Sequence, residues 1–140
     1  MELLAWKLRI TTLWIFFAVG MSAAMVLGIV GTPGLLDDIA SGEVEGMKID
    51  ATLLIFIALF WLVPLTMAFL TLVLRDPINR YANAIVGIVA AAMWAWDLAE
   101  HLSKGLEISG EPLVVVALII AGLLIVWHAW RWPKSTTSTV

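Results

Sequence analysis

The 140-residue chain contains no cysteine, and only 14% of its residues are charged. Without cysteine, the protein can form no disulfide, no thiolate metal site and no thiol redox centre. The net charge of −3 is small, and no basic patch indicates nucleic-acid binding. Phosphate-binding loops, nucleophile motifs and paired metal ligands are also missing from the sequence. These absences favour a non-enzymatic protein that uses no cofactor and no metal ion.

Apolar residues dominate what is present, because 62% of the chain is hydrophobic and its mean hydropathy is +1.01. A soluble domain of this length could not bury so much apolar surface, whereas a bilayer accepts it, and about 20 apolar residues suffice for one crossing. Four stretches meet this requirement, at residues 10–30, 51–74, 80–102 and 113–132. We therefore predict an all-α, multi-pass protein of the cell membrane, a four-helix bundle in contact with the lipid bilayer. Residues 1–134 form its single domain, and residues 135–140 form a small, polar, disordered tail.

The distribution of basic residues predicts the orientation of the bundle. With four spans, the N-terminus, the connection between the second and third spans, and the C-terminus share one side of the membrane. That side carries six basic residues, namely Lys7, Arg9, Arg75, Arg80, Arg131 and Lys134, whereas the other side carries only Lys48 and Lys104. Because basic residues accumulate on the cytoplasmic side, both termini are predicted to be cytoplasmic.

The connections and the second span contain local signals. In the first external connection, apolar residues recur on one helical face (Leu35, Leu36 and Ile39), which predicts a short amphipathic helix at the membrane surface. Asp50 is placed to cap the second span, and Pro64 in the interior of that span predicts a kink. The stretch Arg75–Arg80 is predicted to be a tight turn before the third span.

Small residues recur every fourth position in the first and third spans. They are Gly20, Ala24 and Gly28 in the first span, and Gly87, Ala91 and Ala95 in the third. Such stripes let two helix backbones approach closely, which is how helices associate in lipid. The pattern predicts two close helix contacts, within the chain or with a homo-oligomer or another membrane protein.

A polar stripe lies beside the small residues of the third span. Helical spacing places Asn83, Trp94, Asp97 and His101 on one face, with Glu100 near the same end. Asp97 and His101 are four residues apart, so their side chains can meet. Ionisable groups in a membrane span are costly and need a reason.

Three interpretations of Asp97, Glu100 and His101 remain open. The favoured one is that they mark the solvated outer end of the helix, with Asp97 paired to His101 or to a loop donor. The second is a water-filled, outward-facing pocket lined by Trp94 or Trp61, and the third is a metal or catalytic site. Asn83 is expected to bond across helices and to have a structural role.

The chain also resembles a known family. The resemblance rests on Leu13-Trp14, on Asn79-Arg80 with Ala82-Asn83 and Gly87, and on Ile125-Val126-Trp127, Ala129-Trp130 and Trp132-Pro133. With these motifs, nearly the whole chain is similar to a family of small four-helix prokaryotic integral membrane proteins of unknown function. The resemblance implies acidic residues inside the first, second and fourth helices, but the equivalent positions here are apolar (Met25, Leu62 and Leu118). An acid-dependent role in such relatives has therefore either moved to Asp97 in this chain or been lost.

Two functions are consistent with these features. The favoured hypothesis is a non-enzymatic accessory or assembly subunit that packs through its small-residue faces. The alternative is a small transporter or channel for a cation or amphiphile, with an outward-facing site near Asp97. An open cavity that reaches Asp97 would favour transport, and a sealed bundle with an outward-turned small-residue face would favour assembly.

Overall fold

The computed structural model describes residues 2–44, 46–104 and 110–133. In these ranges the chain is helical apart from one small hairpin. The long helices are α1 (Glu2–Gly31), α3 (Ala51–Val73), α4 (Asp76–Lys104) and α5 (Glu111–Trp130). Each of the four is long and apolar enough to cross a membrane, which indicates a multi-pass membrane protein. The predicted class, all-α with four such helices, is confirmed; the orientation of the termini remains a prediction.

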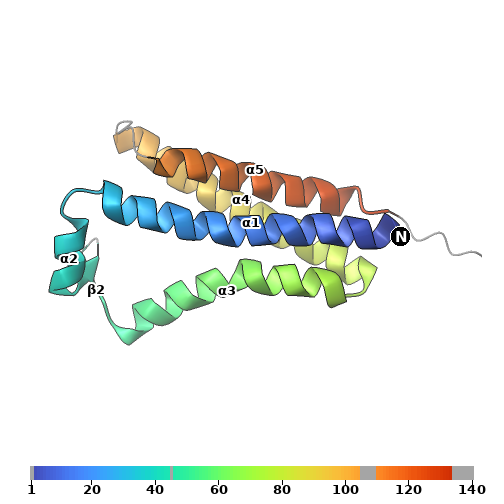
Figure 1. Cartoon of the computed structure of the whole chain (residues 1–140), viewed down its shortest axis with the longest axis horizontal. Coiled ribbons are helices and arrows are strands. Elements are labelled where there is room, and N and C mark those ends of the chain that lie inside the picture. Colours follow the sequence, from blue (N-terminus) through green and yellow to red (C-terminus); the bar gives the residue numbers. More distant parts are fainter. Residues whose placement is uncertain (1, 45, 105–109, 134–140) are drawn as a thin grey trace, which may run out of the picture.

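The helices form a bundle in which α5 and α1 make the central contacts. α5 packs along both α1 and α4, and α3 packs on α1 (Figure 1). We call the end where α1 begins and α5 finishes the terminal end; there the Trp6 indole N–H donates to the His128 carbonyl oxygen at 2.9 Å. The opposite end, where α4 finishes and α5 begins, is the loop end.

The first connection contains the short helix that the sequence predicts. This helix, α2 (Leu35–Ser41), begins and ends at glycines with positive φ, Gly34 and Gly42. Strands β1 (Glu43–Val44) and β2 (Met47–Lys48) then form a small antiparallel hairpin. The position of α2 at a membrane surface remains a prediction.

Two helix starts compare directly with the sequence predictions. The Asp50 carboxylate accepts a hydrogen bond of 2.9 Å from the Leu53 N–H, so the predicted cap of α3 is confirmed. The predicted turn over residues 75–80 is wrong, because α4 already begins at Asp76. Pro77 favours this early start, since a proline in the first helical turn gives up no intrahelical hydrogen bond. The predicted tail, residues 135–140, lies outside the described residues.

The burial of α3 changes abruptly at Pro64. None of residues 51–63 is buried, whereas Pro64, Met67, Ala68 and Thr71 are. Figure 1 shows α3 changing direction near its middle and diverging from the other helices toward the loop end. A proline inside a helix lacks the N–H for one hydrogen bond and clashes with the preceding turn, which bends the helix. The bundle is therefore closed at its terminal end and open beside α3 at its loop end.

Candidate functional site

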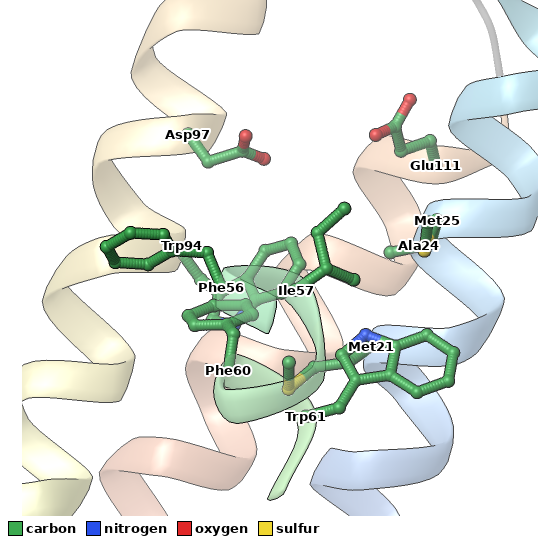
Figure 2. A pocket seen from close by; sticks show the side chains of 10 residues that line it. All are labelled: Met21, Ala24, Met25, Phe56, Ile57, Phe60, Trp61, Trp94, Asp97 and Glu111. Carbon is green, nitrogen blue, oxygen red and sulfur yellow. The ribbon is translucent and has the colours of Figure 1, made fainter. Parts of the chain in front are cut away.

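A cavity of about 440 Å³ lies where α3 diverges from the bundle. Its side walls come from α1, α3 and α4, and the start of α5 contributes Glu111 (Figure 2). The lining residues are Met21, Ala24 and Met25 of α1, Phe56, Ile57, Phe60 and Trp61 of α3, Trp94 and Asp97 of α4, and Glu111. The cavity exists because the part of α3 before Pro64 does not fill the space against α4.

Two carboxylates lie at the same end of this cavity. Asp97 reaches it from α4 and Glu111 from the first turn of α5, on opposite sides of the opening (Figure 2). The Glu111 side chain is 18% exposed and the Asp97 side chain 39% exposed. Both side chains are thus partly exposed, although Asp97 Oδ2 is buried, and most of their neighbours in the cavity are apolar.

His101 lies between the two carboxylates. Its Nδ1 is 3.6 Å from Asp97 Oδ2, and its Nε2 is 3.6 Å from Glu111 Oε2. These distances exceed those of good hydrogen bonds and allow electrostatic attraction. His101 Nδ1 also lies 2.9 Å from the Asp97 carbonyl oxygen, which holds the ring against its own helix.

This group contains two acidic side chains and one imidazole. With both carboxylates ionised, the three side chains carry a charge of about −2 with a neutral ring and about −1 with a protonated ring. Among the described residues that line the cavity, none is lysine or arginine. The opening therefore favours a positively charged ligand.

Aromatic and thioether groups make up most of the remaining wall. Phe56, Phe60 and Trp61 come from α3, and Trp94 lies one turn below Asp97 on α4. Aromatic faces attract cations as well as apolar groups. Met21 and Met25 add flexible apolar surface that adapts to different shapes. The site can therefore hold an apolar body beside a positive charge.

The sequence located only part of this site. Asp97, Trp94 and Trp61 line the cavity and His101 borders it through the two carboxylates, but Glu100 is exposed and does not line it. Glu111 was missed, as were the phenylalanines of α3. Glu111, directly before Pro112, is recognisable in the sequence as part of a helix start. Its contact with His101 of the preceding helix could not be predicted, because periodicity relates only residues of the same helix.

Asn83 is placed far from the cavity, in a buried network at the terminal end. Its Oδ1 accepts hydrogen bonds from Trp14 Nε1 at 2.6 Å and from Thr71 Oγ1 at 3.1 Å. Its Nδ2 donates to the carbonyl and side-chain oxygens of Asn79, at 2.9 Å and 2.7 Å. Asn79 Nδ2 in turn donates to the Thr71 carbonyl oxygen at 2.6 Å, and all four side chains are buried. The network joins α1, α3 and α4.

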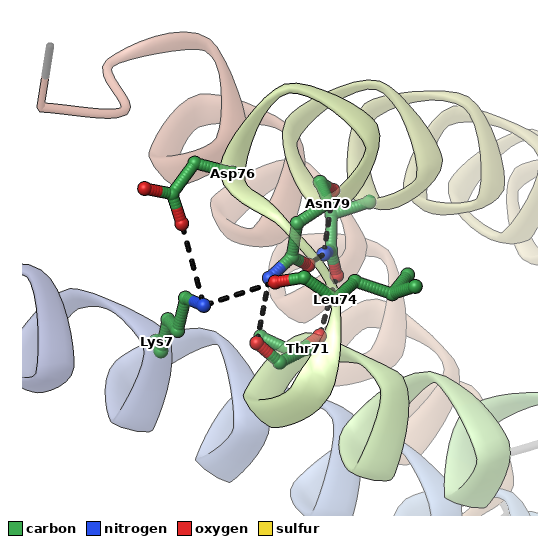
Figure 3. A network of polar contacts seen from close by, with 6 residues as sticks. Lys7, Thr71, Leu74, Asp76 and Asn79 are labelled. Atoms are coloured by element: carbon green, nitrogen blue, oxygen red, sulfur yellow. Dashed lines mark hydrogen bonds and ion pairs between the residues drawn. The ribbon is translucent and has the colours of Figure 1, made fainter. Parts of the chain in front are cut away.

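A second contact secures the same end at the surface of the bundle. Lys7 Nζ donates to the Leu74 carbonyl oxygen at 3.0 Å and lies 3.3 Å from an Asp76 carboxylate oxygen (Figure 3). The lysine thereby satisfies a carbonyl at the end of α3 and the first acidic residue of α4 together. The connection between these two helices is thus fixed to α1.

The small residues of α1 face α5. A methyl group added at Gly20 would lie 2.6 Å from a Leu118 side-chain carbon, and one added at Gly28 would lie 3.0 Å from the Glu111 carboxylate. Ala24, between them, is fully buried. α1 and α5 thus approach closely at Gly20 and Gly28.

The small residues of α4 also face α5, except for the last. A methyl group added at Gly87 would lie 3.0 Å from Val126, and one added at Gly122 would lie 3.0 Å from the Ala91 side chain. Ala95 is exposed. Apart from Ala95, both stripes serve contacts within the chain.

Comparison with known proteins adds the family. A model described as "Family of unknown function (DUF6326)" matches residues 2–139. The chain belongs to this family. No curated protein and no solved structure matches the chain. The family's unknown function agrees with the resemblance found in the sequence, while the prokaryotic character implied by that resemblance remains a prediction.

The described residues also bear on metal binding. In residues 2–44, 46–104 and 110–133, no three histidine, aspartate or glutamate side chains are arranged to hold a metal ion. His101 and its two carboxylates lie in a row, with the ring between the acids.

Proposed function

We propose that the protein binds an organic cation with an apolar body in this cavity and acts as a small transporter for such cations. One observation carries the proposal, namely that an aromatic cavity of about 440 Å³ ends at the carboxylates of Asp97 and Glu111. Pockets of about 300–1,000 Å³ are typical of small-molecule sites. A negative charge at the end of an apolar cavity attracts cations more strongly than the same charge in water, because the local dielectric constant is lower.

The location of the small-residue stripes supports transport over assembly. An assembly role would need a flat small-residue face turned outward, but Gly20, Gly28 and Gly87 lie against α5 of the same chain. Apart from the exposed Ala95, these stripes therefore provide no free surface for a partner subunit. The open cavity that reaches Asp97 is the feature expected of the transport alternative.

The two ends of the bundle also fit a transport cycle. A transporter needs a barrier on one side of its site while the other side is open. The buried network of Asn83 and Asn79 provides a barrier at the terminal end, while the cavity opens at the loop end. With both termini in the cytoplasm, as the basic residues predict, the site faces the outside.

Binding of a hydrophobic cation to the purified protein in lipid nanodiscs tests the proposal. We expect tetraphenylphosphonium to bind wild type, and Asp97→Asn or Glu111→Gln to weaken binding about tenfold or more. Glu100→Gln is the matched control, because Glu100 is an exposed carboxylate on the same helix that does not line the cavity. Equal affinity in wild type and a folded Asp97→Asn protein would contradict the proposed site.

Uptake by proteoliposomes then separates transport from binding alone. We expect reconstituted wild type to accumulate tetraphenylphosphonium faster than protein-free vesicles when the membrane potential is negative inside. Asp97→Asn should reduce this difference, and Glu100→Gln should retain it. If the protein binds the cation but does not increase its uptake, the proposed transport is wrong and the protein is a binding protein.

A further inference from the structure

A second, smaller cavity continues the first toward the terminal end. It has a volume of about 140 Å³ and shares Met21, Phe60 and Trp94 with the larger cavity as common walls. We call this smaller cavity the apolar slot. It runs along α4 from Val86 to Trp94, a rise of roughly 12 Å.

The apolar slot differs from the larger cavity in chemistry. Every residue that lines it is hydrophobic. Trp14 is one of these lining residues. Its indole N–H donates to the Asn83 side-chain oxygen in a buried hydrogen bond and is therefore not available to a ligand. The slot therefore offers no polar group to a ligand, in contrast to the carboxylates at the other end of the combined site.

The apolar slot is also open to the side. Val63 on α3 and Val89 and Met93 on α4 line it and remain about half exposed, because α3 and α4 do not pack together here. In a bilayer these side chains face lipid tails. An empty slot of this kind loses the dispersion contacts that its walls would make with a filled interior. A chain-like apolar group could thus enter sideways from the bilayer.

We propose that the apolar slot holds the tail of the ligand, so that the transported cation is a single-chain amphiphile with an ammonium head. The inference rests on the proposed function and specifies its substrate class. The head would lie in the larger cavity beside Asp97 and Glu111 at the loop end, and the tail would pass Trp94 and Phe60 into the slot. An amphiphile in the adjacent leaflet already has this orientation, with its head at the interface and its tail pointing toward the bilayer centre. Entry between α3 and α4 therefore requires no reversal of the molecule.

Competition in nanodiscs tests the tail subsite. Bound tetraphenylphosphonium is displaced with butyl-, octyl- and dodecyltrimethylammonium, and each free concentration is corrected for partitioning into protein-free nanodiscs. A correction is necessary because lipid tails are as apolar as the slot. We expect octyltrimethylammonium to displace the probe at a concentration about tenfold below that of butyltrimethylammonium after the correction.

Variants that fill the slot provide the decisive comparison. Ala90 is half-buried and lines the slot, so Ala90→Leu should abolish the tail-length preference while leaving tetraphenylphosphonium binding within about twofold of wild type. Ala92→Leu is the matched control, because Ala92 is exposed on the same helix and lines neither cavity. Met93→Trp fills the slot from its rim and replaces Ala90→Leu if that protein does not fold.

Three results would overturn the tail subsite, and they differ in whether the proposed function fails as well. If wild type shows no tail preference beyond partitioning while tetraphenylphosphonium binding still depends on Asp97, the tail subsite fails and the proposed function stands. If no cation binds in an Asp97-dependent way, both fail together. A tail preference that survives both slot-filling variants would place the tail elsewhere and overturn the inference.

Discussion

Helices α1, α3 and α4 contribute to both ends of the bundle, with the start of α5 added at the loop end, and the two ends treat polar groups in opposite ways. At the terminal end, neutral side chains are fully buried and bond to one another, with Asn83 at the centre. At the loop end, the ionisable side chains of Asp97, His101 and Glu111 lie in a row at one end of the open cavity and remain partly exposed. An amide or hydroxyl can be sealed inside a membrane protein once its hydrogen bonds are made, whereas burying a carboxylate is costly. The first arrangement favours a fixed barrier and the second a ligand site.

Pro64 separates these two regions. After it, α3 is buried against α1, and Thr11 Oγ1 donates to the Ala68 carbonyl oxygen at 3.3 Å. Before it, α3 contributes aromatic side chains to the cavity and has no buried residue. One residue therefore defines where the closed part of the bundle ends.

The largest expected effect is in the labelling of the two ends from outside the cell, because each end is either fully accessible to the reagent or not accessible at all. The chain has no cysteine, so single cysteines give clean labelling sites. We expect Ser41→Cys, at the loop end, to react with an impermeant thiol reagent added to whole cells. Ser135→Cys should react only after the cells are broken. The reverse pattern would place the cavity on the cytoplasmic side and invert the comparison of the two ends.

Removing the centre of the terminal network should give the largest loss of stability. Asn83→Leu leaves the buried Trp14 N–H without its acceptor and removes the Asn83 donor to the Asn79 side-chain oxygen, and each such loss costs about 1–3 kcal/mol. The Thr71 hydroxyl keeps its bond to the Met67 carbonyl oxygen at 2.7 Å. We expect the thermal midpoint in mild detergent to fall clearly. Thr12→Val is the control, since the Thr12 hydroxyl is exposed and bonds within its own helix to Leu8. A wild-type midpoint for Asn83→Leu would show that the closed end does not depend on this network.

A large residue on the α4–α5 contact should cost somewhat less. Gly87→Leu forces side-chain carbons toward Val126 and Ile125, and overpacking of this kind costs about 1–3 kcal/mol. Ala95→Leu is the matched control two turns further along the same stripe, where the position is exposed. We expect only Gly87→Leu to lower the thermal midpoint. Equal effects at both positions would mean that the exposed end of the stripe also packs against another helix in the membrane.

Restoring the missing hydrogen bond of α3 should affect binding more than stability. Pro64→Ala allows a straighter helix, so the part before residue 64 should move toward the other helices and narrow the cavity. We expect tetraphenylphosphonium affinity to fall about tenfold, equivalent to about 1.4 kcal/mol. The distance between spin labels at Ile55 and Ile88 should shorten in the same variant. Unchanged distance and affinity would show that the divergence of α3 does not depend on Pro64.

The smallest expected effect concerns His101. Because its ring lies 3.6 Å from both carboxylates, it competes with a cation for them. We expect His101→Gln to raise tetraphenylphosphonium affinity about threefold, or about 0.7 kcal/mol. His128→Gln, at the terminal end, is the control and should have no effect on binding. A loss of affinity in His101→Gln would mean that the ring positions the carboxylates more than it competes for their charge.

The sequence predicted features that depend on one helix at a time. Hydrophobic runs indicated the four long helices, Asp50 indicated the start of α3, and Pro64 indicated where its interior is interrupted. It failed at Asp76, where proline chemistry extends α4 into the expected turn. Local rules of this kind are readable from the chain because hydrogen bonds and apolar periodicity within a helix involve neighbours a few residues apart.

Only the tertiary structure decided which faces meet. Periodicity placed Gly20 and Gly87 on flat faces, but the packing order gave both of these faces to α5. Periodicity also placed Asn83 and Asp97 on one stripe of α4. In the structure, Asn83 bonds to Trp14 and Thr71 in the closed end of the bundle, whereas Asp97 lies beside the open cavity that the divergence of α3 creates. Glu111 meets His101 because the start of α5 packs beside the end of α4. A helical pattern fixes the direction of each side chain about its own axis; what it contacts depends on how the other helices are arranged around that axis.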